Sequence, residues 1–496
     1  MPAHPSLDAL TLDHGYAGLG EAFHARVIPT PLADPQLLHF NRDAAALIDL
    51  DPVAAGSPDF LATMAGNRLL PGGDYLASIY AGHQFGSWVP QLGDGRAILV
   101  GQVRNADGAL WELQLKGAGP TPFSRFADGR AVLRSSIREY LCGEAMHHLG
   151  IPSNRALCLV GSPQRVRRET IETAAVVCRM APSFIRFGHF ELFYSRQQFD
   201  ALRQLADYVI DTQFPQLASR EDRHLAWLVE VTERTAKLMA QWQSVGFCHG
   251  VMNTDNMSIL GLTLDYGPYG FMDGFDAGHI CNHSDEGGRY AWDQQPRIGH
   301  WNVSRLVQAT LPLLHEVPEE AVKIGSGILD RYAPVYSQRM LELWRAKFGL
   351  REARDGDETL VNRFLTLLHQ GRSDFTRSFR HLSGIASGSD KPEPMRDEIQ
   401  AQATFDAWVP DYRARLRAEQ SDDAERRVRM NAVNPKYVLR NHLAQACIEK
   451  AEQGDFSEID RLMRLLHRPF DDQPEFEAYA AEPPPEAREI SVSCSS

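Results

Sequence analysis

The side chains most able to do chemistry lie in one short segment near the middle of the chain. Residues 247–267 read FCHGVMNTDNMSILGLTLDYG, in which a His249-Gly250 turn is followed by Asn256 and then by Asp265. Amide and carboxylate oxygens are hard ligands that suit a divalent cation, and phosphate oxygens can complete its coordination shell. An Asp-Tyr-Gly alone would indicate only a turn, but the upstream His-Gly and Asn give it weight. The segment therefore predicts a site for a divalent cation bound together with a nucleotide.

This spacing matches that of a kinase catalytic centre except at one position. Kinases place an Asp two residues after the His, where it accepts the proton of the attacking hydroxyl. Val251 occupies that position here, and a valine side chain cannot accept a proton. Asp255, beside Asn256, is the nearest remaining carboxylate and is our candidate base, although it could also be a solvated loop residue. His249 is expected to be structural rather than catalytic.

Three chemistries are compatible with this arrangement. The chain could transfer a nucleotidyl group to a protein, it could be a phosphotransferase with Asp255 as a displaced base, or it could be a catalytically silent nucleotide-binding scaffold. ATP labelled at the α- or the γ-phosphate would separate the three, because each predicts a different labelled product.

A lysine and a glutamate upstream follow the order found in the small lobe of kinases. Lys116 ends the strand LWELQLK, and Glu139 lies in the next helix. In kinases such a pair forms an ion pair that holds the lysine against phosphate oxygens. There is an alternative for each residue: Lys116 could be a surface charge, and Ser136-x-x-Glu139 could be a capping box that starts the helix. The downstream metal motif favours the ion pair.

Further residues are candidates for binding phosphates. Arg179 and Arg186 follow a buried strand and flank a proline turn, where they could grip phosphate bidentately or satisfy backbone carbonyls. Two glycine-containing turns could bring backbone N–H groups to phosphates or could be plain turns. Their residues are Gly93, Gly95 and Arg96 in the first turn, and Asp128, Gly129 and Arg130 in the second.

Composition narrows the class of protein. The chain has 496 residues, 43% of them hydrophobic, and a formal net charge of −13. The hydrophobic content is ordinary for a globular protein. The negative net charge argues against binding to duplex nucleic acid, because such binding usually requires a surplus of Lys and Arg. No apolar run is long enough to cross a membrane, and the start of the chain lacks a secretory signal. We therefore expect a cytoplasmic protein with neither a nucleic-acid nor a membrane partner.

The cysteines do not predict a zinc site. They lie at positions 142, 158, 178, 248, 281, 447 and 494, without CxxC pairs or ligand-like spacing to histidines. We expect most of the thiols to be buried. Cys494 is different, because it is third from the end of the chain, in SVSCSS.

We expect an α+β fold in three parts. Residues 1–85 are interpreted as an N-terminal extension of short helical pieces. Residues 86–300 are the nucleotide-binding core, with a small lobe over about 86–190 and a large lobe from about 191. Residues 301–496 are mostly helical and end in the cysteine-containing tail.

Local patterns predict particular elements. Strands are expected at 97–100, 110–116 and 174–180, and helices at 135–150 and 220–242. Asn434-Pro435 is interpreted as an N-cap followed by the first helical position, which predicts a helix through Ala451.

Four long motifs resemble the selenoprotein O family, whose bacterial members are called YdiU proteins. They are YAGHQFGSWVPQLGDGRAILVGQV, LQLKGAGPTPFSRFADGRAVLRSSIREYL, APSFIRFGHFE and HGVMNTDNMSILGLTLDYGPYGFMD. The similarity extends from Pro29 to the end of the chain, and motifs of this length do not arise by chance.

The resemblance implies a bilobal protein-kinase-like fold that binds ATP in a flipped orientation. Such an enzyme transfers AMP from ATP, or UMP from UTP, to Ser, Thr or Tyr hydroxyls of proteins and releases pyrophosphate. By matching motif, Asp255 is the proton acceptor, Asn256 and Asp265 are the Mg²⁺ or Mn²⁺ ligands, and Glu139 is the partner of the lysine. The implied nucleotide contacts are Gly93, Gly95, Arg96, Lys116, Asp128, Gly129, Arg179, Arg186 and Asp265.

The resemblance also bears on two cysteines and on Val251. Cys494 occupies the position of selenocysteine in some relatives, and in some bacterial members it pairs with the cysteine matching Cys281, a regulatory disulfide. A flipped triphosphate points its γ-phosphate at Lys116 and the arginines and presents its α-phosphorus near Asp255. The usual base position is then unnecessary, which accounts for Val251.

Overall fold

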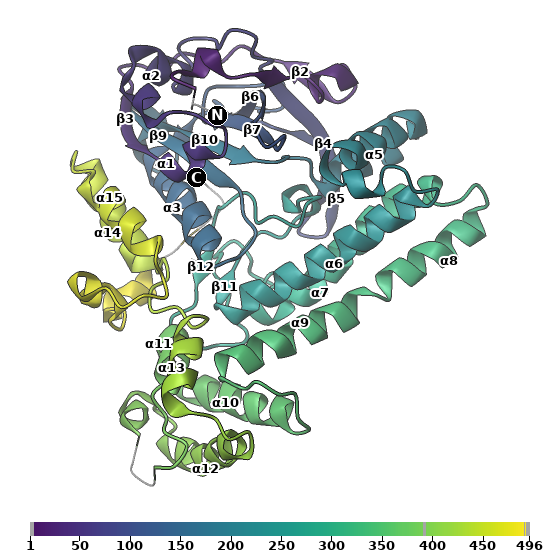
Figure 1. The fold of residues 1–496 in the computed structure, drawn as a ribbon. Coiled ribbons are helices and arrows are strands. Elements are labelled where there is room, and N and C mark those ends of the chain that lie inside the picture. Colours follow the sequence, from purple (N-terminus) through teal and green to yellow (C-terminus); the bar gives the residue numbers. More distant parts are fainter. Residues whose placement is uncertain (1–3, 390–392, 491, 493–496) are drawn as a thin grey trace.

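The computed structural model describes residues 4–389, 393–490 and 492. Its largest element is a ten-stranded sheet in which the neighbouring strands are antiparallel (Figure 1). The main path runs β2-β4-β6-β7-β10-β9-β3, while β1 pairs with β6, β5 with β4 and β8 with β10. The strands are β1 (Leu12–Asp13), β2 (His24–Arg26), β3 (Gln36–Phe40), β4 (Leu76–Gln84), β5 (Ser87–Gly93), β6 (Ala97–Arg104), β7 (Leu110–Lys116), β8 (Ala131–Val132), β9 (Arg155–Arg167) and β10 (Ile171–Ala181).

The central strands are buried on both faces. In β10, Val176 and Cys178 pack in one hydrophobic cluster with Phe60 of α2, whereas Val177 packs in another cluster with Ile137 of α3. Successive side chains of a strand point to opposite faces, so this alternation places α2 (Pro58–Met64) and α3 (Leu133–His148) on opposite sides of the sheet. Strand β10 therefore fixes α3, and with it Glu139, relative to Lys116 on β7.

The N-terminal 85 residues contain strands of the large sheet in addition to the short helical pieces that the sequence predicts. They contain the whole of β1, β2, β3 and β4, and all four pair within the large sheet. Strands β1, β2 and β3 have only two to five residues. In so short a segment, the alternation of apolar and polar residues that marks a strand cannot be recognised. The short helix α1 (Arg42–Ala46) does begin at an N-cap: the Asn41 side chain accepts from the N–H groups of Asp43 and Ala44.

Helices make up most of the remainder. Helices α6, α7 and α9 lie side by side below the sheet in Figure 1, and α14 and α15 return to pack against α3. A separate hydrophobic cluster is formed by residues of α9 to α13 with neighbouring segments. The bounds are α4 (Phe187–Ser195), α5 (Phe199–Gln213), α6 (Arg223–Ser244), α7 (Gln295–Thr310), α8 (Pro318–Leu329), α9 (Tyr332–Lys347), α10 (Asp357–Gly371), α11 (Phe375–Leu382), α12 (Gln402–Ala418), α13 (Asp423–Asn431), α14 (Asn441–Glu452) and α15 (Ser457–Leu466).

The predicted strands at 97–100, 110–116 and 174–180 and the helices at 135–150 and 220–242 are confirmed, with shifts of a few residues at their ends. The helix predicted from Asn434 is wrong, because α14 begins at Asn441. The Asn434 side chain is buried and donates to the Lys347 carbonyl at 2.9 Å. It ties the segment before α14 to the end of α9 instead of capping a helix. Among the described residues, none of the helices has the length and apolar character needed to cross a bilayer.

Candidate active site

A cavity of about 660 Å³ lies between the large sheet and the segment that follows β11 (Phe247–Cys248). Twelve of the predicted site residues line it: Gly93, Gly95, Arg96, Lys116, Asp128, Gly129, Arg130, Arg179, Arg186, Asp255, Asn256 and Asp265. Val251, in the base position of kinases, also lines the cavity. The folded chain thus brings together residues that lie far apart in the sequence.

Glu139 lies behind the cavity wall and holds two of its cations. Its carboxylate accepts from Lys116 Nζ at 2.5 Å and from Arg179 Nη1 at 3.1 Å. Burial lowers the pKa of Lys116, and the charge of Glu139 opposes this effect. The capping-box alternative for Glu139 is wrong, since α3 begins at Leu133 and Ser136 lies inside the helix. Of the two interpretations, the ion pair is the one observed.

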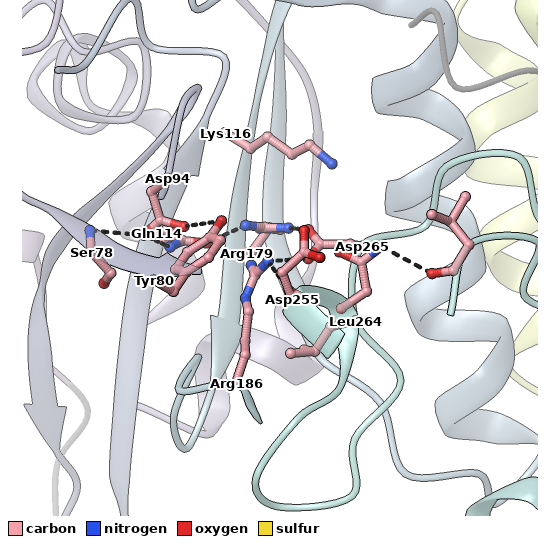
Figure 2. Close-up of polar contacts among 12 residues, drawn as sticks. Ser78, Tyr80, Asp94, Gln114, Lys116, Arg179, Arg186, Asp255, Leu264 and Asp265 are labelled. Atoms are coloured by element: carbon pink, nitrogen blue, oxygen red, sulfur yellow. Dashed lines mark hydrogen bonds and ion pairs between the residues drawn. The ribbon is translucent and has the colours of Figure 1, made fainter. Parts of the chain in front are cut away.

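Asp265 is the most strongly held acid of the site. Its two carboxylate oxygens lie 2.6 Å from Arg179 Nη1 and 2.5 Å from Arg186 Nη1. Burial alone would raise the pKa of Asp265, but the charges of Arg186, Arg179 and Lys116 outweigh burial and hold this pKa well below its usual value. Figure 2 shows the polar contacts continuing from Asp265 through Arg179 to Gln114 and Asp94.

The backbone of Asp265 is held in an uncommon conformation. Its φ angle is 56°, in the left-handed region, where the backbone of a residue other than glycine is strained. The preceding residue, Leu264, accepts a hydrogen bond of 2.9 Å from His249 Nε2, and the His249 ring stacks on Trp242. His249 is therefore structural, as expected, and it anchors the chain just before Asp265.

Asp255 reaches the cavity from a 3₁₀ turn (Thr254–Asn256). The residue is only 7% exposed, and burial raises the pKa of its carboxyl to about 6, against the opposing effects of Gln84 and Arg186. Gln84 Nε2 donates to Asp255 Oδ2 at 3.1 Å, and Oδ1 is shielded without a hydrogen-bond partner among the described residues. A carboxylate with this pKa is mostly ionised at neutral pH and can accept a proton.

The oxygens around Asn256 suit a hard divalent cation. Asn256 Nδ2 donates to the Val251 carbonyl at 2.9 Å, which fixes the amide and leaves its Oδ1 as a ligand atom. Asp265 Oδ2 is shielded from solvent and has no hydrogen-bond partner among the described residues, although Arg186 balances its charge. An amide oxygen and a carboxylate are the donor set that Mg²⁺ or Mn²⁺ prefers.

The sequence analysis missed the residues that hold Asp255. Three consecutive residues at the tip of the β4–β5 hairpin bond to three consecutive residues of the 253–255 segment. His83 N donates to Thr254 Oγ1 at 2.7 Å, and Phe85 N donates to Asn253 Oδ1 at 3.0 Å, on either side of the Gln84–Asp255 bond. The glycine-flanked GHQFG at residues 82–86 was a usable signal, because it indicated a tight hairpin whose exposed tip needs a partner.

Helix α4 also comes unusually close to this turn. A Cβ at Gly188 would lie 2.1 Å from the Ala81 carbonyl oxygen and 3.5 Å from the Asp255 Cα. Only glycine permits this approach. From the same helix, Glu191 Oε1 lies 2.6 Å from His83 Nδ1, so α4 supports both the hairpin and the turn that carries Asp255.

Both glycine-containing turns pack closely against residues of the loop that follows β7. A Cβ at Gly93 would lie 2.4 Å from the Phe123 ring, and one at Gly129 would lie 2.2 Å from the Gly119 backbone. Both glycines thus have a packing reason in addition to their place in the cavity wall. Asp128 accepts two hydrogen bonds from the Arg168 guanidinium, at 2.9 and 3.0 Å, which anchors the second turn.

The cysteine pair falls partly outside the structure. Cys494 lies outside the described residues. Cys281 is buried, and its Sγ donates to the Cys248 carbonyl at 3.3 Å. A Cβ added to Gly250 would lie 2.8 Å from that sulfur, so Cys281 packs directly on the His249-Gly250 turn. The disulfide implied by the family resemblance stays a prediction.

Comparison with known proteins identifies the family. The family model described as protein adenylyltransferase SelO matches residues 7–467. A protein nucleotidyltransferase YdiU of Methylococcus capsulatus is 58% identical over 97% of this chain and 95% of its own length. The proteins of the same name from Myxococcus xanthus and Paraburkholderia xenovorans are 55% and 54% identical, each over 99% of this chain and over 100% and 96% of their own lengths. The chain therefore belongs to the protein adenylyltransferase SelO family.

Proposed function

We propose that this protein transfers AMP from ATP, or UMP from UTP, to a Ser, Thr or Tyr hydroxyl of another protein, with release of pyrophosphate. Family membership supports nucleotidyl transfer as the reaction class. The observation that carries the proposal is the position of the ionisable groups: Asp255 lies in the cavity wall, and Val251 occupies the base position of kinases. We place the activity in the cytoplasm, where ATP and UTP are formed and used.

The cations of the cavity favour a reversed triphosphate. Lys116, Arg179 and Arg186 lie together around Asp265, and Arg96 lines the same cavity. The terminal phosphate of a triphosphate carries more negative charge than the α- or the β-phosphate, so Coulomb attraction in a buried, low-dielectric site draws this end to the cations. The α-phosphorus then lies towards Asp255. The sheet with α3 and the helices below it would form the two lobes of a kinase-like fold, which is part of this proposal.

A divalent cation would be held by Asn256 and Asp265, and when bound it would supply neutralisation of the charge that develops on the phosphate oxygens. The two arginines on Asp265 have a second role in this account. As triphosphate binds, Arg179 and Arg186 would share their N–H donors between Asp265 and phosphate, as guanidinium forks allow. Glu139 would keep Arg179 and Lys116 in place during that exchange.

The chemical step that follows is an attack by the acceptor hydroxyl on the α-phosphorus. A bond forms between the hydroxyl oxygen and phosphorus, the bond between phosphorus and the bridging oxygen to the β-phosphate breaks, and pyrophosphate leaves with that electron pair. Asp255 accepts the proton of the hydroxyl. Its pKa of about 6 is close to the working pH, as a general base requires.

The position of the radioactive label in the product tests the proposal. The full chain is incubated with Mg²⁺ or Mn²⁺, an acceptor protein such as casein and the chain itself, and ATP labelled at the α- or the γ-phosphate. We expect protein-bound label from the α-position and none from the γ-position. Label from the γ-position alone would instead establish a phosphotransferase, and no label with demonstrable ATP binding would leave a silent scaffold.

A further inference from the structure

A second cavity, of about 470 Å³, is lined by residues of α1, α3 and α15 and of the segment that follows α15. It shares no lining residue with the cavity described above. Three of its lining residues, Asp43, His148 and His467, lie close enough together to hold one metal ion. They come from three elements, because Asp43 lies in the first turn of α1, His148 ends α3, and His467 follows directly after α15.

The three side chains converge. One ligand atom from each lies within 4.8 Å of the other two. The rings of His148 and His467 lie 4.2 Å apart between centroids, and His467 Nδ1 lies 3.6 Å from Asp43 Oδ2. This last separation is beyond a hydrogen bond, so the packing of the elements rather than direct bonding holds the ligand atoms together.

Both imidazoles have a nitrogen without a partner. The Nε2 atoms of His148 and His467 are shielded from solvent and accept or donate no hydrogen bond among the described residues. A shielded polar atom without a partner is destabilising. Glu144 does not relieve His148, because its carboxylate lies 3.9 Å from His148 Nε2 and is occupied by Arg155 at 2.7 Å. The two nitrogens are therefore free to bind an electron-pair acceptor.

The surrounding charges are compatible with a cation. The cavity is also lined by two arginines, and each has an acidic neighbour outside the cluster. Arg464 lies 3.2 Å from Asp460, and Arg468 lies 3.9 Å from Asp471.

We propose that Asp43, His148 and His467 bind a zinc ion that joins α15 to α1 and α3. Two imidazole nitrogens and a carboxylate oxygen are a usual ligand set for Zn²⁺, with water as the fourth ligand. Bonds of about 2.0–2.2 Å at tetrahedral angles place ligand atoms roughly 3.3 Å apart, so the side chains must move closer. Asp43 can do this at little cost, because its side chain is 59% exposed.

Zinc at this position would act on stability and on the end of α3. The three ligands lie far apart in the sequence, so the unfolded chain has no such site, and binding free energy adds to folding free energy. Helix α3 also carries Glu139, which holds Lys116 and Arg179. The ion would hold the C-terminal end of α3, at His148, against the segment that follows α15.

The experiment uses the full chain, titrated with Zn²⁺ against a competing chromophoric chelator in excess Mg²⁺. Magnesium occupies oxygen sites such as that of Asn256 and Asp265 but binds imidazole poorly. We expect one Zn²⁺ per chain and a rise in unfolding temperature on zinc addition. His467→Ala should weaken zinc binding about 100-fold or more and abolish the rise, and Asp43→Asn should weaken it at least about tenfold.

The matched control is His14→Ala. It removes a histidine that is paired with an aspartate but does not belong to the proposed zinc site. His14 Nδ1 lies 3.0 Å from Asp74 Oδ2, and we expect zinc binding to stay unchanged in this variant. Asp43→Asn keeps the test sound if His467→Ala fails to fold, since Asp43 is exposed. Equal zinc affinity in the parent and Asp43→Asn, or no binding in the parent, would overturn the proposal.

Substitution of Co²⁺ for Zn²⁺ identifies the ligands. A nitrogen and oxygen site gives the visible bands of four-coordinate Co²⁺ without the near-ultraviolet charge-transfer band of a thiolate. That thiolate band, or visible bands that persist in His467→Ala, would assign the metal to a cysteine or to another site and would also contradict the proposal.

Discussion

The Gln84 amide donates a hydrogen bond of 3.1 Å to the Asp255 carboxylate, which joins the tip of the β4–β5 hairpin to the candidate base. Bonds from His83 to Thr254 and from Phe85 to Asn253 flank it. The hairpin therefore sets both the position of Asp255 and its affinity for a proton. Burial raises the pKa of Asp255 and the Gln84 bond lowers it, so the value of about 6 depends on this contact.

Replacing Gln84 by Leu should impair transfer without impairing nucleotide binding. Loss of the hydrogen bond removes an interaction that favours ionised Asp255, so the pKa of the base rises and the rate below pH 7 falls. We expect kcat to fall about tenfold, the inflection of the rate to move to higher pH, and the Kd for ATP to stay unchanged. Gln91→Leu on the same hairpin is the control. Among the described residues, the Gln91 side chain is hydrogen-bonded to the Arg196 side chain and not to Asp255. A fall in ATP affinity with an unmoved inflection would contradict a positioning role.

The rate of transfer should depend on pH through Asp255. A base acts when it is deprotonated, so kcat should rise with pH through about 6 and level off above it. In Asp255→Asn the rate should fall by about 10²–10⁴-fold and lose this dependence. Equilibrium binding of ATP, measured separately, should change little. A variant that loses ATP binding instead would mark Asp255 as a ligand.

Asp265→Asn should abolish transfer and destabilise the protein. The carboxylate balances Arg179 and Arg186, both buried, and removing one partner of a buried ion pair costs about 3–5 kcal/mol. The pKa of Asp265 is lowered on folding, so its contribution is present above the unfolded pKa and is lost as the pH falls. The parent should therefore lose stability on acidification more steeply than the variant. Urea unfolding at several pH values measures this, with Asp276→Asn, on the partly exposed Asp276–Arg372 pair, as control.

Glu139→Gln should weaken triphosphate binding. Glu139 holds Lys116 and Arg179 together, and the neutral amide leaves these cations unbalanced and free to reorient. We expect the Kd for ATP to rise about tenfold, or about 1.4 kcal/mol. Glu172→Gln removes a comparable pair with Arg134 away from Asp265 and serves as the control. Unchanged affinity for ATP in Glu139→Gln would show that the ion pair is structural only.

Much of the site could be predicted because its residues lie in short, regular contexts. Asn256 and Asp265 follow a recognisable spacing, and Lys116 ends a strand of clear alternation. The ion pair of Lys116 with Glu139 was one of two interpretations, and the observed contact and the start of α3 at Leu133 decided between them.

Other parts depend on contacts between distant segments, which a single sequence does not contain. The first three strands have two to five residues and gain their stability from the sheet they join. Gln84 bonds to a residue 171 positions away. Asn434 carries the pattern of an N-cap, but a buried bond to the Lys347 carbonyl uses its side chain. Local preference yields to burial in such cases.

The most direct test of the reversed nucleotide is a crystal structure of the chain with a non-hydrolysable ATP analogue and Mn²⁺. We expect the terminal phosphate in contact with Lys116 and Arg179, and the α-phosphorus as the phosphorus atom nearest Asp255. A terminal phosphate that lies nearest Asp255, with the α-phosphate beside Lys116, would contradict the account.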